Sequence, residues 1–124
     1  MGKLFLVVAG LSGCAGVILG ALAAHGLKDR LLADALMQID TASRYLLIHA
    51  LLLVLTAVLA RSHADAMVIK VAGVAVITGI ILFCGGLSLS ALTGLKVLTA
   101  GAPVGGTAFM VGWLSLAYFG LTKL

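Results

Sequence analysis

The chain has 124 residues, of which 63% are hydrophobic and only 10% are charged, and its formal net charge is +4. So few polar residues cannot cover a hydrophobic core of this size in water, whereas lipid solvates apolar side chains. The composition therefore excludes a soluble domain and indicates an integral membrane protein. Lys and Arg are scattered along the chain, which argues against nucleic acid as a partner.

The first uncharged run extends from Leu4 to Ala24, long enough at ~1.5 Å per residue to cross ~30 Å of hydrocarbon. Ala21-Leu22-Ala23 resembles a signal-peptide cleavage site, but the run is longer than the apolar region of a signal peptide. We therefore expect a retained span over residues 4–25. Small residues recur along it at helical spacing and allow a second helix to approach closely. The predicted packing residues are Ser12, Gly16 and Gly20.

Residues 27–40 carry a different pattern. Leu31 and Ile39 fall on the apolar half of a helical wheel, whereas Asp29 and Asp34 fall on the polar half. This pattern is typical of a short helix lying in the headgroup plane. The sequence therefore predicts an interfacial amphipathic helix over residues 27–40, with a plain connector as the alternative.

Three further apolar runs predict spans over residues 42–61, 66–93 and 103–122. Pro103 is favoured in the first turn of a helix and marks the start of the last span. Trp113 lies deep in that span and needs a hydrogen-bond partner for its indole N–H. The predicted packing residues of these spans are Gly85, Gly86 and Gly112.

These elements predict an all-α fold class, a polytopic membrane protein in which four antiparallel transmembrane helices form a bundle and one domain over residues 1–124. Both termini are expected on one side of a cell membrane, the inner membrane if the source is bacterial. Lys and Arg divide equally between the two sides, so their distribution does not fix the orientation.

Polar residues gather on the side opposite the termini. Tyr45 and His49 lie four residues apart and share a helix face, and Asp40 and Arg44 have the same spacing nearby. The predicted topology brings the end of the first span and the start of the last to the same side. The candidate ligand-binding residues are His25, Lys28, Arg44, Tyr45, His49 and Lys96.

Four interpretations of this cluster remain open. His49 and Tyr45 can be packing residues bonded to neighbouring helices. The cations can bind an anionic lipid headgroup or small anion beside the N-terminus of the last span. His49, Tyr45 and Asp40 can relay protons or ions, or His25 and His49 can ligate a metal or haem. Our function hypothesis is the second, a membrane component with membrane lipid as its partner.

Catalytic motifs are missing from the sequence, which has no phosphate loop, no H-E-x-x-H and no Glu. We therefore expect no enzymatic activity. A recognisable set of metal ligands is also missing, and Cys14 and Cys84 lie in apolar stretches as core-filling residues, so we expect no metal and no other cofactor. The glycine strips raise self-association into a homo-oligomer as a further hypothesis.

Four segments resemble the elements of one protein family. Residues 20–28 are similar to its G-A-x-x-A-H-G-L element, residues 41–51 to T-A-x-x-Y-x-x-x-H-A-L, residues 83–94 to F-x-G-S-L-Y-x-L-x-L-T-G, and residues 103–113 to P-x-G-G-x-x-F-x-x-G-W. The family is domain of unknown function 423, which includes eukaryotic transmembrane protein 256. The resemblance implies a small four-span bacterial inner-membrane protein and no established activity. Gly86 departs from it, standing where the pattern commonly has Ser.

Overall fold

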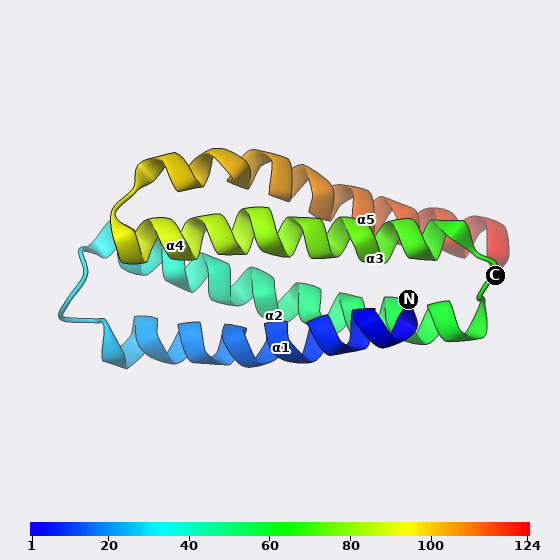
Figure 1. Ribbon diagram of the computed structural model, residues 1–124, viewed down its shortest axis with the longest axis horizontal. Coiled ribbons are helices and arrows are strands. Elements are labelled where there is room, and N and C mark those ends of the chain that lie inside the picture. Colours follow the sequence, from blue (N-terminus) through cyan, green and yellow to red (C-terminus); the bar gives the residue numbers. More distant parts are fainter.

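The computed structural model describes residues 1–124, and all of its regular elements are helical. Four long helical segments run antiparallel along one axis, and both termini lie towards the same end of the bundle (Figure 1). Each segment is long and apolar enough to cross a membrane. The predicted fold class, an all-α bundle with four spans, is confirmed.

Only one of the four segments is an uninterrupted α-helix. The other three each contain a π-helical or 3-10 stretch, and Gly94 ends the third in the left-handed conformation (φ 76°), which a residue with a Cβ rarely adopts. The elements in chain order are α1 (Gly2–Ala21), η1 (Leu22–Gly26), α2 (Ala33–Ser62), α3 (Met67–Gly79), η2 (Ile80–Gly85), α4 (Gly86–Thr93), η3 (Lys96–Gly101) and α5 (Ala102–Lys123).

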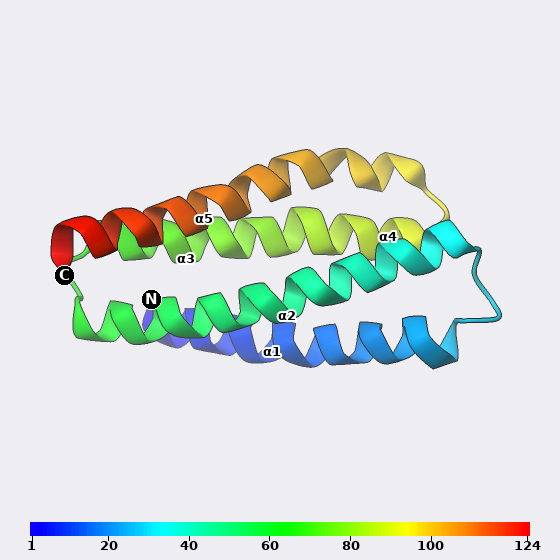
Figure 2. The ribbon, with the colours of Figure 1, turned by 180° about the vertical axis from the view of Figure 1, so that it is seen from behind.

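The bundle consists of two helix pairs, one above the other. In both views the pair of α1 and α2 lies below the pair formed by α3–α4 and α5 (Figures 1 and 2). Phe5, Leu53 and Val76 are fully or almost fully buried and pack together between the pairs. We call the end that holds residues 26–32 and 94–96 the hairpin end, and the end that holds Met1, residues 63–66 and Leu124 the termini end.

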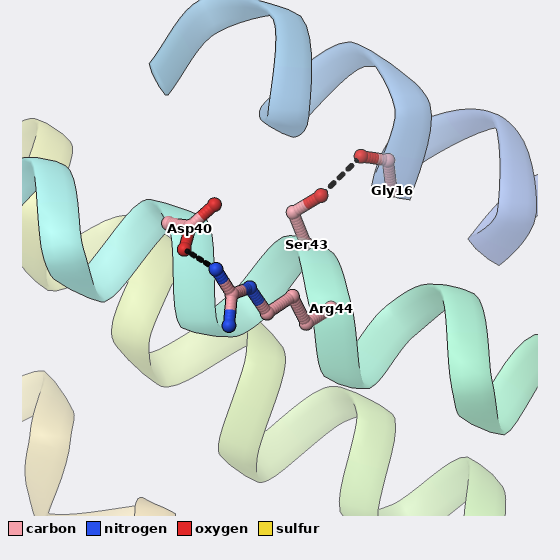
Figure 3. A network of polar contacts seen from close by, with 4 residues as sticks. All are labelled: Gly16, Asp40, Ser43 and Arg44. Atoms are coloured by element: carbon pink, nitrogen blue, oxygen red, sulfur yellow. Dashed lines mark hydrogen bonds and ion pairs between the residues drawn. The ribbon is translucent and has the colours of Figure 1, made fainter. Parts of the chain in front are cut away.

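Small residues on α1 allow it to lie close against α2. A Cβ added at Gly16 would lie 2.9 Å from Leu47 Cγ, and one added at Gly20 would lie 2.9 Å from Ser43 Oγ. The Ser43 hydroxyl donates a hydrogen bond of 2.6 Å to the Gly16 carbonyl (Figure 3). Ser12 is buried on the same strip. The strip thus places a backbone carbonyl of α1 within reach of a side chain on α2.

The second pair has its own close approaches. A Cβ at Gly112 would lie 2.7 Å from Val76 Cγ2, one at Gly86 would lie 2.6 Å from the Leu98 carbonyl oxygen, and one at Gly105 would lie 2.5 Å from the Phe83 nitrogen. Gly85 was also predicted to be a packing residue, and this prediction is wrong. A Cβ added at Gly85 would contact no neighbouring helix, because the nearest atom is the Ile80 carbonyl oxygen of the same segment at 3.9 Å.

The predicted interfacial helix over residues 27–40 is wrong. Residues 27–32 form a turn, and α2 begins at Ala33, so that residues 33–40 are its first two turns. The apolar half of the predicted helix continues in phase with α2, since Ile39 and Ala42 are both fully buried against the bundle. The second helix therefore starts well before residue 42, and the helical path of the last segment begins at Lys96 rather than at Pro103.

Candidate functional site

His49 lies near the middle of α2 and is only 3% exposed. Its Nδ1 lies 2.7 Å from the Tyr45 carbonyl oxygen, and the Trp113 indole N–H donates to its Nε2 at 3.1 Å. A carbonyl can only accept and an indole can only donate, so Nδ1 carries the proton and Nε2 accepts. Both nitrogens of a neutral imidazole are thereby used, and Trp113 has the partner that its N–H was predicted to need.

Aromatic rings enclose this hydrogen-bonded histidine. Phe109 stacks on the imidazole, with ring centroids 3.6 Å apart and an angle of 16° between the planes, and Trp113 meets it edge-on at 6.0 Å. Tyr45 stacks against His49 at 5.8 Å and contacts Phe83 at 4.6 Å. We call these five residues from α2, η2 and α5 the aromatic cluster.

Two glycines make room for the aromatic cluster. At Gly79 the Phe109 ring occupies the place of a side chain, and at Gly105 the backbone of Phe83 does so. The Phe109 ring therefore reaches His49 only because Gly79 has no Cβ, and α5 approaches the Phe83 backbone closely only because Gly105 has none. The cluster is a packed contact between the two helix pairs.

His25 and His49 do not come together. His25 lies in η1 at the hairpin end and is exposed. Sixteen residues separate Ala33, where α2 begins, from His49, which therefore lies about 24 Å along the helix from its start. Across the contact of α1 with α2, Ala50 beside His49 lies against Gly13, which is twelve residues, or about 18 Å of helix, from His25. The two histidines therefore lie at different depths of the bundle. A shared metal or haem site of the two is excluded by this separation.

The cations among the candidates lie at the hairpin end and are exposed. Arg44 Nη2 contacts Asp40 Oδ2 at 3.0 Å, and the two side chains are 74% and 49% exposed (Figure 3). This pair, predicted from its spacing, is the only ion pair in the structure. Lys28, which follows η1, and Lys96, which begins η3, have no carboxylate partner.

A hollow of about 250 Å³ also lies at the hairpin end, between the first turns of α2 and α4. Its polar lining comes from Asp34, Gln38 and Thr41, and Met37 and Leu87 complete it. None of the six candidate residues lines this hollow. The candidates thus separate into two groups. His49 is buried in the bundle with Tyr45, itself 40% exposed, stacked beside it, and the other four are exposed.

Sequence reasoning missed the members of the aromatic cluster outside α2. Phe109 and Trp113 are four residues apart, as are Tyr45 and His49, so each pair shares one helix face. That matching spacing on two apolar spans is the signal that could have suggested the contact. Gly105, four residues before Phe109, belongs to the same face.

Comparison with known proteins agrees with the resemblance found in the sequence. The family model described as protein of unknown function (DUF423) matches residues 19–106. The chain belongs to this family. A UPF0382 membrane protein of Haemophilus influenzae is 39% identical over 114 residues, 92% of this chain and 90% of that protein. The UPF0382 membrane protein YwdK of Bacillus subtilis is 32% identical over 92% of this chain and 93% of its own length.

A third relative, a UPF0382 membrane protein of Staphylococcus aureus, is 34% identical over 92% of each chain. No solved structure matches the chain. The relatives are named membrane proteins, and this chain has four helices able to span a bilayer. The protein is therefore a multi-pass membrane protein.

Proposed function

We propose that this protein is a non-enzymatic membrane component that binds a phosphate-bearing lipid headgroup or a small anion at its hairpin end. The observation that supports the proposal is the exposure of the Arg44 guanidinium group. The side chain is 74% exposed and Asp40 contacts only one of its terminal nitrogens, so its other N–H groups have no partner within the protein. Guanidinium binds phosphate through two parallel hydrogen bonds, which makes Arg44 the central candidate.

Lys28 and Lys96 support Arg44 as additional positive charges at the same end. A Lys or Arg at an anionic membrane surface contributes about 1 kcal/mol of attraction. The carboxylates Asp29, Asp34 and Asp40 offset most of the charge of the four cations in this region. The expected binding is therefore weak and depends on local contacts with the phosphate rather than on the overall field.

A proton or ion path through Tyr45 and His49 has less support. Both imidazole nitrogens already have partners within the bundle, and Phe109 covers one face of the ring. A relay requires at least one of these bonds to break for each transfer. The same contacts favour a packing role for the histidine.

The test is to titrate the purified full-length protein with phosphatidylglycerol vesicles, phosphatidylcholine vesicles and inorganic phosphate. We expect the K28Q/R44Q/K96Q variant to lose about a hundredfold in affinity for phosphatidylglycerol, since it loses three surface cations at about 1 kcal/mol each. The K70Q/K123Q variant removes cations at the termini end and serves as the control. Equal binding by the triple variant and the wild type would overturn the proposal. Competition by inorganic phosphate assigns the site to a small anion, and its absence assigns it to a lipid headgroup.

A further inference from the structure

Two hollows, which share Leu6 as a lining residue, lie along the outer face of the α1–α2 pair. One hollow, of about 560 Å³, is lined by small and apolar residues of both helices, among them Gly10, Cys14 and Leu51. The second hollow, of about 550 Å³, extends to Lys3 and Arg61 at the termini end. We call the two hollows together the α1–α2 groove.

Two glycines of this groove, Gly10 and Gly13, are not needed for helix packing. A Cβ added at Gly10 would meet no atom within 4 Å, and one added at Gly13 would meet only Ala50 Cβ at 3.8 Å. Gly16, one turn further along, is closed against Leu47. The missing side chains at the first two positions therefore open a lipid-facing hollow instead of allowing a closer approach of α2.

Positive charge lies at only one end of the groove. Lys3 and Arg61 are exposed, and neither has a carboxylate within ion-pair distance. The termini end carries four Lys and Arg residues against a single carboxylate, Asp65, whereas the hairpin end carries four against three. The surplus charge of the chain is thus concentrated where the groove opens towards the membrane surface.

The length of the groove corresponds to one leaflet. From Lys3 to Cys14 the α1 helix rises by about 16 Å, close to half of the ~30 Å hydrocarbon core. We propose that the groove holds one anionic phospholipid, with its phosphate between Lys3 and Arg61 and an acyl chain along Gly10 and Gly13. Apolar lining at one end and unpaired cations at the other match the two parts of such a lipid. This site is separate from the hairpin end and does not depend on the function proposed there.

The test measures retention of phosphatidylglycerol on the full-length protein in detergent by native mass spectrometry, with phosphatidylcholine and inorganic phosphate as comparison probes. We expect K3Q/R61Q to lower the affinity for phosphatidylglycerol about tenfold, because two charge-assisted contacts are lost. K70Q/K123Q removes the same charge from the same end outside the groove and is expected to leave the affinity unchanged.

A second pair of variants tests the groove independently of charge. Gly10→Leu fills the hollow and is expected to lower lipid retention with Lys3 and Arg61 intact. Gly120→Leu places the same side chain at another open glycine, since a Cβ there also meets nothing within 4 Å, and should have no effect. Three results would each overturn the proposal, namely an equal loss in K70Q/K123Q, full retention in Gly10→Leu, or displacement of the lipid by inorganic phosphate.

Discussion

The contact of α1 with α2 and the contact around His49 both depend on glycines and on one hydrogen bond between helices, yet they differ in what the glycines face. Gly16 and Gly20 face Cγ and a methyl group of Leu47 and the Ser43 hydroxyl, which are side-chain atoms that can shift more easily than a helix backbone. Gly105 and Gly79 face the backbone of Phe83 and the ring of Phe109. The first interface can adjust to added volume, whereas the second consists of rigid groups on both sides. We therefore expect the contact around His49 to be the less tolerant one.

The largest expected effect is that of Gly105→Ala. The added methyl group would lie 2.5 Å from the Phe83 nitrogen, and relieving the overlap requires the two helix backbones to separate. We expect a loss of about 3 kcal/mol in the free energy of unfolding, measured in mixed micelles by titration with a denaturing detergent. Gly16→Ala is the matched variant of the other interface and is expected to cost about 1 kcal/mol. An equal cost for the two variants would contradict the comparison.

The hydrogen bond from Trp113 to His49 is expected to have an intermediate effect. His49→Phe and Trp113→Phe each leave one polar group of this part-buried hydrogen bond without its partner and should each cost about 1–2 kcal/mol in the free energy of unfolding. The double variant removes both groups, so its cost should fall short of the sum by about 1 kcal/mol. Strictly additive costs would show that the two rings are not coupled. Trp113 is the sole Trp, so its emission should also shift in His49→Phe.

The smallest expected effect is that of Ser43→Ala, which removes the hydrogen bond to the Gly16 carbonyl. Hydrogen bonds between transmembrane helices average about 0.6 kcal/mol, and the carbonyl also keeps its helical bond. The unfolding titration should therefore show a loss of about that size. Thr107→Ala, which removes a bond from an exposed side chain to its own helix, serves as the control and should change less. If Ser43→Ala lost more free energy of unfolding than the His49 variants, the contact of α1 with α2 would be the less tolerant one and the comparison would be contradicted.

The spans and the fold class follow from the sequence because apolar runs of membrane length leave a helix as the only available structure. The ion pair of Asp40 with Arg44 follows as well, since spacing alone sets it. The start of α2 does not, because Asp34 and Asp40 suit either an interfacial helix or the exposed side of a long span. The bond between His49 and Trp113 joins positions 64 residues apart and depends on the relative register of two helices, which no local pattern encodes.

The same limit applies to the glycines and to the candidate site. Gly85 and Gly86 are neighbours of identical type, yet only Gly86 meets another element. Which of two adjacent glycines faces a partner depends on the π-helical turn of η2, which rotates the following residues about the helix axis. The sequence identified His49 and Tyr45 as special residues, but their depth in the bundle required the helix boundaries.

The uninterrupted α2 has a consequence for the surrounding lipid. Between Arg44 and Arg61 its uncharged stretch is about 24 Å long, whereas that of the third segment, from Val71 to Thr93, is about 34 Å. No single bilayer thickness matches both. We expect the difference to be accommodated by snorkelling of Arg44 and Arg61 or by thinner lipid beside α2 than beside α3 and α4. Hydrophobic mismatch of this kind gives each face its own preferred lipid length.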